Sequence, residues 1–285
     1  MSIGIITKGI SGKYIVYDGS GYHECSPRGI FRKEKITPLP GDKVGFDNDT
    51  IKTVYKRKNK FIRPAVANVD QMAFFISVSS PEPDFYLLDK MIITAFYNDV
   101  DILLCVNKND IDDNDMSARI KSIYGALGIK VIIMSALNGP GVDGLYKELE
   151  NKITVLSGQS GAGKSTALNC IFQKEIMETG NVSRKTERGK HTTRHSELFK
   201  FKEGFIADTP GFSSYELPDI DKNKLKNFYP EFEKYSDSCK FKECIHINEP
   251  GCGVKQALED GIIDQGRYNR YIKLWTSLQE RNNYG

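Results

Sequence analysis

The segment Gly158–Ser165, GQSGAGKS, constrains the fold of this chain more than any other stretch. It satisfies the pattern GxxxxGK[ST], and it lies between an apolar segment, ITVL, and a helical segment, STALNCIF. Such a loop needs a strand before it and a helix after it, because backbone N–H groups at the helix start converge on phosphate oxygens. The sequence therefore predicts an α/β domain with a nucleoside triphosphate site. The alternative is a glycine-rich turn that holds a lysine by chance.

Each residue type in this loop has a chemical task. The lysine reaches the terminal phosphates, and the hydroxyl of Ser165 is expected to coordinate the Mg²⁺ that accompanies the nucleotide. The residues predicted to bind nucleotide here are Gly158, Gln159, Ser160, Gly161, Ala162, Gly163, Lys164, Ser165 and Thr166.

The segment Asn107, Lys108, Asn109 and Asp110 follows the predicted strand VDILLCVN and spells NKxD. A carboxylate at Asp110 accepts hydrogen bonds from N1–H and the exocyclic amine of guanine, and adenine offers no such pair. We expect this carboxylate to be buried, so that leaving it unpaired rejects other bases. Lys108 is expected to cover the base, and Asn107 to tie this loop to the phosphate loop. Taken alone, the segment is equally consistent with a surface turn.

Ser135 and Ala136 come at the end of another predicted strand, KVIIM. A backbone N–H at this point is expected to bind O6 of guanine. Together with NKND and a complete phosphate loop, these residues favour GTP over ATP.

Two further elements follow the phosphate loop. The segment GKHTT supplies Thr192 and Thr193, whose hydroxyls are expected to reach Mg²⁺ and the terminal phosphate. The segment DTPG follows the apolar strand GFIA, so Asp208 is expected to hold Mg²⁺ through water and the N–H of Gly211 to contact the terminal phosphate. Alone, DTPG is also compatible with a simple turn.

The order of these motifs is base, base, phosphate, switch, switch, which is the usual GTPase order cyclically permuted. A closed domain with neighbouring termini tolerates such a change, because the site depends on spatial positions rather than on where the chain begins. One consequence is that the second switch leads directly into the C-terminal segment.

The group that orients the attacking water is not obvious. Many GTPases use a glutamine shortly after the DxxG glycine, but here Phe212 follows and no glutamine is near. The sequence therefore predicts slow intrinsic hydrolysis that a partner accelerates. His191 is the best internal candidate for a catalytic role, and the alternative is a solvated or RNA-facing histidine.

The hydrophobic pattern divides the chain into three parts. Residues 1–64 carry five short strand patterns without a helix-period segment, which predicts a small all-β barrel such as an OB-fold. Residues 65–214 alternate strands and helices, which predicts a doubly wound α/β GTPase domain. Residues 215–285 hold a cysteine cluster and helical segments, which predicts a mostly helical zinc-binding domain.

The cysteine pattern points to a metal. Of six cysteines, Cys239, Cys244 and Cys252 lie close together with His246 among them. In a reducing compartment this Cys₃His set suits one structural Zn²⁺ per chain, with all four ligand positions filled. The alternatives are a disulfide or unlinked buried cysteines.

The net charge of +3 demands no nucleic-acid partner, but basic residues cluster locally. The best candidate RNA-binding patch beside the barrel comprises Lys56, Arg57, Lys58, Lys60 and Arg63, and the alternative is a solvated linker. Arg267, Arg270 and Lys273 lie at helical spacing. They are a further candidate for RNA contact, and an ordinary solvated face explains them equally well.

The sequence gives no sign of a membrane location. The N-terminus lacks a basic segment followed by an apolar run, and no stretch reaches the roughly 18 apolar residues that span a bilayer. We therefore expect a cytoplasmic protein with no membrane partner, and a monomer, since no coiled-coil pattern is present.

The combination of motifs resembles the ribosome small-subunit-dependent GTPase A (RsgA) family. The resemblance rests on the basic barrel, NKND, SA, GQSGAGKST, GKHTT, DTPGF and the Cys-x₄-Cys-x-His-x₅-Cys cluster, and it spans nearly the whole chain. It implies an OB-fold, a circularly permuted GTPase domain, a zinc domain, and a role in late maturation of the small (30S) ribosomal subunit with contacts to its rRNA. A hydrophobic residue at the position of Phe212 also fits the family.

Two rival functions remain open. One is a GTP-gated RNA-binding factor in which hydrolysis is incidental. The other is a protein-binding signalling switch that uses the zinc segment as an effector platform.

Overall fold

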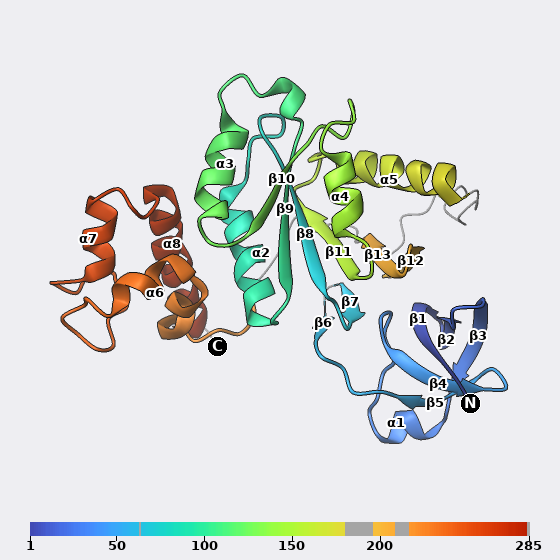
Figure 1. Ribbon diagram of the computed structural model, residues 1–285. Helices are drawn as coiled ribbons and strands as arrows, with labels where there is room; N and C mark the ends of the chain where they lie inside the picture. The colour runs from blue at the N-terminus through green and yellow to red at the C-terminus, as the bar shows by residue number, and fades with distance from the viewer. Residues whose placement is uncertain (63, 180–195, 209–216, 284–285) are drawn as a thin grey trace.

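The computed structural model describes residues 1–62, 64–179, 196–208 and 217–283. Three regions follow one another along the chain: a β-barrel, a central sheet covered by helices, and a C-terminal group of helices (Figure 1). The all-β, α/β and mostly helical parts expected from the sequence are confirmed. The exact divisions at residues 64 and 214 stay a prediction.

The barrel is closed, with strand order β1-β2-β3-β5-β4. Alternating side chains point inward, and the interior holds Ile6, Val16, Val44, Phe46 and Ile51. The strands are β1 (Ser2–Ile10), β2 (Lys13–Tyr17), β3 (Tyr22–Pro27), β4 (Lys43–Asp47) and β5 (Thr50–Val54).

A one-turn helix, α1 (Ile30–Lys33), lies between β3 and β4. The expectation that no helix interrupts the barrel strands was therefore wrong. Four residues are too few to display a helical period, and the turn is fixed by burial of Phe31 in the barrel core.

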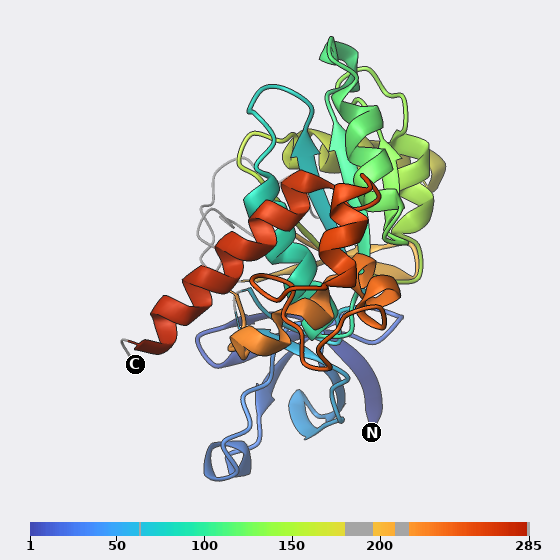
Figure 2. The same cartoon turned by 90° about the vertical axis from the view of Figure 1, so that its left-hand side faces the viewer.

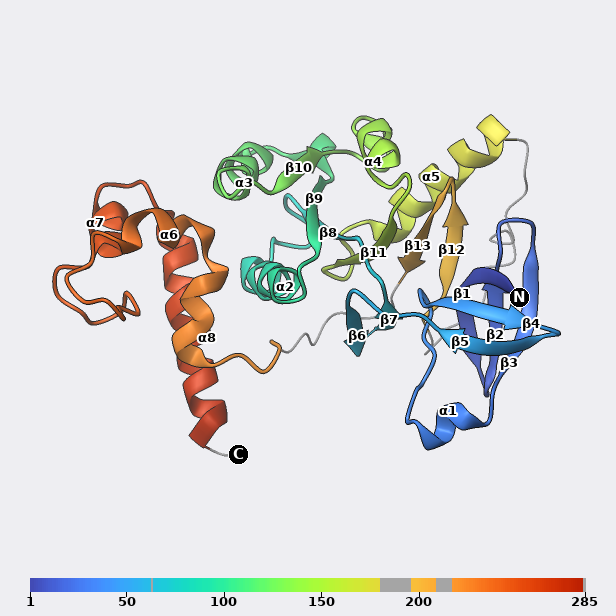
Figure 3. The same cartoon turned by 60° about the horizontal axis from the view of Figure 1, so that its bottom comes forward.

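The connection from barrel to sheet is a hairpin of β6 (Lys60–Ile62) and β7 (Ala65–Ala67). The predicted boundary at residue 64 falls between its two strands. The barrel also touches the sheet at a second place, where β1 lies beside β12 (Leu198–Phe201) (Figure 3). Lys8 of β1 forms an ion pair of 2.8 Å with Glu197, just before β12.

The central sheet has the strand order β10-β9-β8-β11-β13-β12 among the described residues. All neighbours are parallel except β12, which runs antiparallel to β13 at the edge and which the sequence did not reveal. Every residue of β8 and β11 is buried, as expected for central parallel strands. The strands are β8 (Gln71–Ser77), β9 (Asp101–Asn107), β10 (Lys130–Ile133), β11 (Ile153–Gly158), β12 (Leu198–Phe201) and β13 (Gly204–Asp208).

Helices cover both faces of this sheet (Figure 1). One face packs against α2 (Phe85–Tyr97) and α3 (Met116–Gly125) through Leu88, Met91 and Ile120. The other face packs against α4 (Val142–Glu148) and α5 (Lys164–Thr179) through Leu145, Leu168 and Ile171. The doubly wound arrangement predicted from the alternating pattern is confirmed.

The C-terminal region consists of η4 (Lys222–Phe228), α6 (Pro230–Ser236), α7 (Gly253–Glu259) and α8 (Gln265–Asn283). It has its own core, which includes Leu225, Phe232, Val254 and Leu274. Helix α8 crosses in front of α2, so α2 lies between α8 and the sheet (Figure 2). Within the part of the chain that is described, no helix is long and apolar enough to cross a membrane.

Candidate functional site

The phosphate loop joins the end of β11 to the start of α5, at the carboxyl edge of the parallel strands. Glycine is required at both ends of the loop. Gly158 has φ +130°, and a Cβ there would lie 2.2 Å from the carbonyl oxygen of Phe75. Lys164 Nζ lies 2.9 Å from the carbonyl oxygens of Gly158 and Gln159, so the lysine lies over the loop. Ser160, Gly161, Ser165 and Thr166 are exposed around the helix N-terminus.

Asn107 joins three predicted nucleotide-binding segments through its buried side chain. Its Nδ2 donates to the carbonyl oxygen of Ala162 at 2.8 Å, and its Oδ1 accepts from the N–H of Ala136 at 2.9 Å. The expected tie from Asn107 to the phosphate loop is thereby confirmed. Gly163, with φ +90°, leaves room for this bond, because a Cβ there would lie 2.1 Å from Asn107 Nδ2.

The segment predicted to read guanine is held in a specific shape. Lys108 adopts a left-handed conformation (φ +67°), and the N–H of Asn109 donates to the carbonyl oxygen of Met134 at 3.1 Å. Asp110, in the short helix η1 (Asn109–Ile111), is exposed. The protein by itself therefore does not bury this carboxylate. The selectivity predicted at Asp110 would therefore require the base itself to cover the carboxylate.

Ser135 and Ala136 lie after β10 and are both buried. Their N–H groups donate to the carbonyl oxygen of Pro140 at 2.9 Å and to Asn107 Oδ1 at 2.9 Å. A bond from Ala136 to guanine O6 would therefore compete with an internal bond. Cys170 of α5 donates from Sγ to the Ala136 carbonyl oxygen at 3.2 Å, so the phosphate-loop helix also supports this turn.

Sequence reasoning missed the loop between β8 and α2, which lies beside both nucleotide segments. Gln159 of the phosphate loop donates from Nε2 to the carbonyl oxygen of Glu82 at 2.7 Å and accepts at Oε1 from the N–H of Asp84 at 3.3 Å. Lys108 Nζ donates to the carbonyl oxygen of Ser80. The available signal was that the loop between β8 and α2 follows a buried parallel strand, because ligands bind at the carboxyl edge of such strands.

Several predicted site residues fall outside the described parts of the chain. These are His191, Thr192, Thr193, Gly211 and Arg63. Asp208 ends β13, next to Leu156 of β11 in register, which puts its backbone on the strand beside the phosphate loop.

The four predicted metal ligands come together. One ligand atom from each of Cys239, Cys244, His246 and Cys252 lies within 4.8 Å of the other three. His246 turns Nδ1 toward Cys239 Sγ at 3.6 Å and toward Cys252 Sγ at 3.4 Å, and Nε2 lies 3.3 Å from Ser236 Oγ. Backbone N–H groups of Gly253 and Lys255 point at the sulfurs of Cys239 and Cys252. The arrangement is typical of a ligand set with supporting hydrogen bonds.

The distances fit a tetrahedral ion. With Zn–S bonds of about 2.3 Å and a Zn–N bond of about 2.0 Å, tetrahedral geometry separates sulfurs by about 3.8 Å and sulfur from nitrogen by about 3.5 Å. The Cys239–Cys252 sulfur separation is 3.9 Å. Burial and the nearby Lys226 lower the pKa of His246 to about 4, so the imidazole is neutral at pH 7. Burial raises the pKa of Cys244 to about 12, so metal binding must displace its proton.

The predicted RNA-binding patch divides into two kinds of residue. Lys56 and Lys60 are exposed. Lys58 is exposed as well, and it pairs with Asp70. Arg57 instead donates to both carboxylate oxygens of buried Asp42, at 2.6 and 2.7 Å, and to the Thr37 carbonyl oxygen. Arg57 therefore ties the segment after β5 to the segment before β4.

The C-terminal arginines do not form a solvated face. Arg267 is buried, and it donates to Asp89 of α2 at 2.7 Å and to Glu231 of α6 at 2.5 Å. Arg270 donates from Nε to the second oxygen of Asp89 at 2.5 Å. Burial opposes the charge of Arg267, but Asp89 and Glu231 outweigh it and raise the pKa of the guanidinium above its usual value. A helical spacing of charges does not reveal which face another domain covers.

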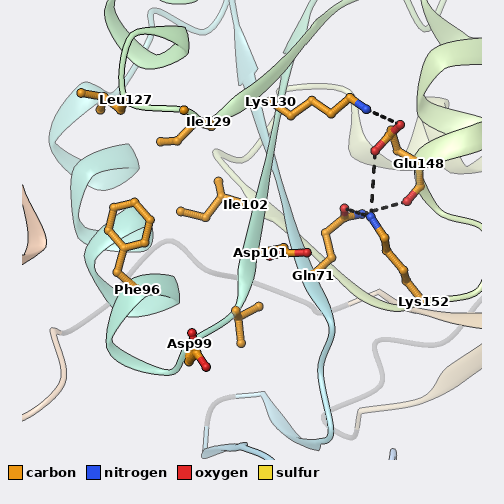
Figure 4. Close-up of a pocket in the computed structure, with 12 residues that line it drawn as sticks. Gln71, Phe96, Asp99, Asp101, Ile102, Leu127, Ile129, Lys130, Glu148 and Lys152 are labelled. Atoms are coloured by element: carbon orange, nitrogen blue, oxygen red, sulfur yellow. Dashed lines mark hydrogen bonds and ion pairs between the residues drawn. The ribbon is translucent and has the colours of Figure 1, made fainter. Parts of the chain in front are cut away.

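A cavity of about 420 Å³ lies at the amino ends of the parallel strands, and Figure 4 shows the residues that line it. Its lining includes Gln71, Asp101 and Lys130, at the amino ends of β8, β9 and β10. Two of the lining residues, Lys130 and Glu148, form an ion pair of 2.5 Å. Binding at the carboxyl edge is the rule for open α/β sheets, so this cavity is not part of the nucleotide site.

The loops at the carboxyl edge define the class of protein. A phosphate loop, an NKxD segment and an SA turn, joined by Asn107 and following β11, β9 and β10, form the site of a P-loop GTPase whose chain is circularly permuted. Residues 54–218 match the family described as RsgA GTPase, and residues 3–55 match the RsgA N-terminal domain. The chain belongs to the RsgA GTPase family, and it is a GTP hydrolase.

Relatives of similar length support this assignment. A "Small ribosomal subunit biogenesis GTPase RsgA" from Ruminiclostridium cellulolyticum is 49% identical, over 100% of this chain and 96% of the relative. One of the same name from Agathobacter rectalis is 42% identical, over 99% of both chains. The crystal structure of YjeQ from Thermotoga maritima matches with a TM-score of 0.83 and 34% identity, over 98% of both chains. That of YloQ, described as a circularly permuted GTPase, matches with a TM-score of 0.80 and 37% identity, over 99% and 96%.

Proposed function

We propose that this GTPase binds the small ribosomal subunit and acts in its late maturation, with slow intrinsic hydrolysis that the subunit accelerates. The observation that carries the nucleotide part is the pair of bonds from Asn107 to Ala162 and Ala136, because it brings base-reading and phosphate-binding segments to one place. The ribosomal part follows from the relatives, which are named as small ribosomal subunit biogenesis GTPases.

The substrate site is proposed to use the residues that the motifs indicate. Asn107–Asp110, Ser135 and Ala136 hold guanine, while Gly158–Thr166 and Gly211 hold the phosphates. Ser165, Thr192, Thr193 and Asp208 would hold Mg²⁺, which neutralises phosphate charge when bound. The exposed position of Ser165 in the first turn of α5 is consistent with this role.

Positioning of the attacking water is assigned to His191, since Phe212 replaces the glutamine of other GTPases. A His191→Ala variant should lose most of the subunit-stimulated turnover and keep GTP affinity. Full stimulated turnover in that variant would remove the assignment.

The Cys₃His cluster is proposed to bind one structural Zn²⁺. All four ligand positions are supplied by protein, which leaves no position for a substrate, and the segment around it is short. The ion would hold together the loops between α6 and α7, which carry the four ligands.

RNA contacts are proposed for Lys56, Lys58 and Lys60, beside the barrel, with Arg63 as a further candidate. Their exposed ammonium groups suit sequence-tolerant phosphate contacts. Arg57 is not available in the same way, because Asp42 holds it. A role on the ribosomal subunit would place the protein in the cytoplasm, and we infer that it acts there as a monomer.

GTP turnover with and without purified small ribosomal subunits tests the proposal, with Lys164→Ala as the inactive control. Strong stimulation by the subunit is the expected result. Tight nucleotide-dependent binding without stimulation would instead favour a GTP-gated RNA-binding factor. Absence of binding would leave a protein-binding switch.

A further inference from the structure

Helix α2 contacts the phosphate loop at its first turn. Asp84 caps the helix, since its side chain accepts from the N–H of Leu87 at 2.9 Å. The backbone of this same residue donates to Gln159 Oε1, and Gln159 Nε2 holds Glu82. One side chain of the phosphate loop therefore fixes the segment that starts α2.

About one and a half turns further along, α2 contacts the C-terminal region through Asp89. Its carboxylate is fully buried and accepts from Arg267, Arg270 and the hydroxyl of Tyr124 of α3, the last at 2.9 Å. Glu231 supplies the second negative charge for Arg267. Two carboxylates and two guanidinium groups thus balance one another, with Asp89 and Arg267 buried and Glu231 and Arg270 partly exposed, and the orientation of α2 relative to α8 is fixed at this point.

The next side chains of α8 reach the metal cluster. Tyr268 donates from its hydroxyl to the carbonyl oxygen of His246 at 2.6 Å, and Tyr271 donates to that of Ile245 at 2.6 Å. Contacts therefore run without a gap from Gln159 through α2 and Asp89 to α8 and a predicted metal ligand.

We propose that Asp89 and the side chain of Gln159 position the phosphate loop for nucleotide binding, and that through them the C-terminal region sets the shape of this loop. Asp89 fixes α2 against α8, and the start of α2 then holds Gln159. If α2 is no longer held in place, the phosphate loop becomes less ordered. Part of the binding free energy is then used to order this loop, which weakens nucleotide affinity. Because coupling between two sites is reciprocal, bound nucleotide must also stabilise α8.

The test measures GDP and GTP affinity of the isolated chain for Asp89→Asn, Gln159→Ala and the double variant. Each single change should weaken affinity about 5- to 30-fold, the range of moderate coupling. The double variant should be little worse than either single one, because both changes break the same connection. Asp42→Asn is the matched control. Asp42 is also a buried carboxylate paired with an arginine, but it lies in the barrel region, so the nucleotide affinity of this variant should be unchanged.

Hydrogen exchange of the α8 amides provides a second measurement. Its dependence on GDP would not change if Asp89 and Gln159 only stabilised the fold. GDP should slow this exchange in the unaltered chain and not in Gln159→Ala. Unchanged affinity in Asp89→Asn, an additive double variant, or equal weakening in Asp42→Asn would each overturn the proposal. If Asp89→Asn fails to fold, Arg270→Gln, which removes one partner of Asp89, replaces it in the same cycle. No ribosomal subunit is used, so the outcome is independent of the proposed ribosomal role.

Discussion

Arg267 of α8 donates a hydrogen bond of 2.7 Å to Asp89 of α2, across 178 positions of sequence. Both side chains are buried, and α2 in turn packs on the central sheet. The C-terminal region is therefore joined to the GTPase domain by charge as well as by apolar packing. The permuted order leads the chain from the second switch toward this region, and α2 provides a second connection.

Removal of Arg267 should destabilise the protein strongly. Arg267→Met leaves the buried Asp89 and the partly buried Glu231 with one cation fewer, and we expect a loss of about 3–5 kcal/mol in the free energy of unfolding. Urea unfolding followed by emission of Trp275, the single tryptophan of the chain, measures it. Lys130→Ala breaks an ion pair whose lysine is exposed and should cost less than about 1 kcal/mol. Similar losses in the two variants would contradict this account.

Asp110→Asn should change base preference. The amide replaces one carboxylate oxygen by a donor, so it no longer accepts both hydrogen bonds from guanine, and GTP affinity should fall about 100-fold or more. Xanthine presents an oxygen where guanine has its amine, so the variant should prefer XTP. Competition between GTP and XTP for a labelled nucleotide measures both effects. Unaltered preference for GTP would remove Asp110 from the base site.

Gly163→Ala should disrupt the site through a clash as well as through backbone strain. Its Cβ would lie 2.1 Å from Asn107 Nδ2, which must move and lose its bond to Ala162. Gly128 also has positive φ (+77°) but faces open space, so Gly128→Ala adds only strain of about 1–2 kcal/mol. Nucleotide affinity should fall sharply for Gly163→Ala and stay near its original value for Gly128→Ala. Equal affinities would show that the contact is unimportant.

Loss of the proposed zinc should loosen the C-terminal region and leave the barrel folded. Cys252→Ser should reduce bound zinc, measured by atomic absorption, from about one per chain to near zero, because a hydroxyl is a poor replacement for a thiolate. Trp275 emission should shift to longer wavelength as α8 is exposed. Cys25→Ser, in the barrel core, should retain the zinc. Retention of zinc in Cys252→Ser would contradict the ligand set.

Neutralising Lys56 and Lys60 together should weaken binding to the small ribosomal subunit and reduce its dependence on salt. Each phosphate contact that is lost should lower the slope of log affinity against log salt by about 1. Binding measured between low and moderate salt gives this slope. Lys130→Gln, on the sheet domain, is the control and should bind like the unaltered chain. A slope that stays constant would place the RNA contact elsewhere.

The sequence by itself determined the parts whose chemistry depends on short spacing. The phosphate loop, NKND, the SA turn and the Cys₃His set were all readable, because each needs particular side chains within a few residues or directly after a strand. The doubly wound sheet and five barrel strands followed from hydrophobic periodicity, whereas α1 and edge strand β12 were too short to show one.

Only the tertiary structure decided which charged groups are buried and which remain available. Nothing in the neighbouring sequence distinguishes Arg57, Arg267 and Arg270 from solvated basic residues. Each of these arginines is nevertheless paired with a buried carboxylate. Asp110, by contrast, is left exposed by the protein itself. Burial depends on which distant segments dock together, and the hydrogen bonds of Asn107 and Gln159 likewise join residues about 55 and 75 positions apart. No local pattern records such contacts, because their partners are chosen by the packing of the whole chain.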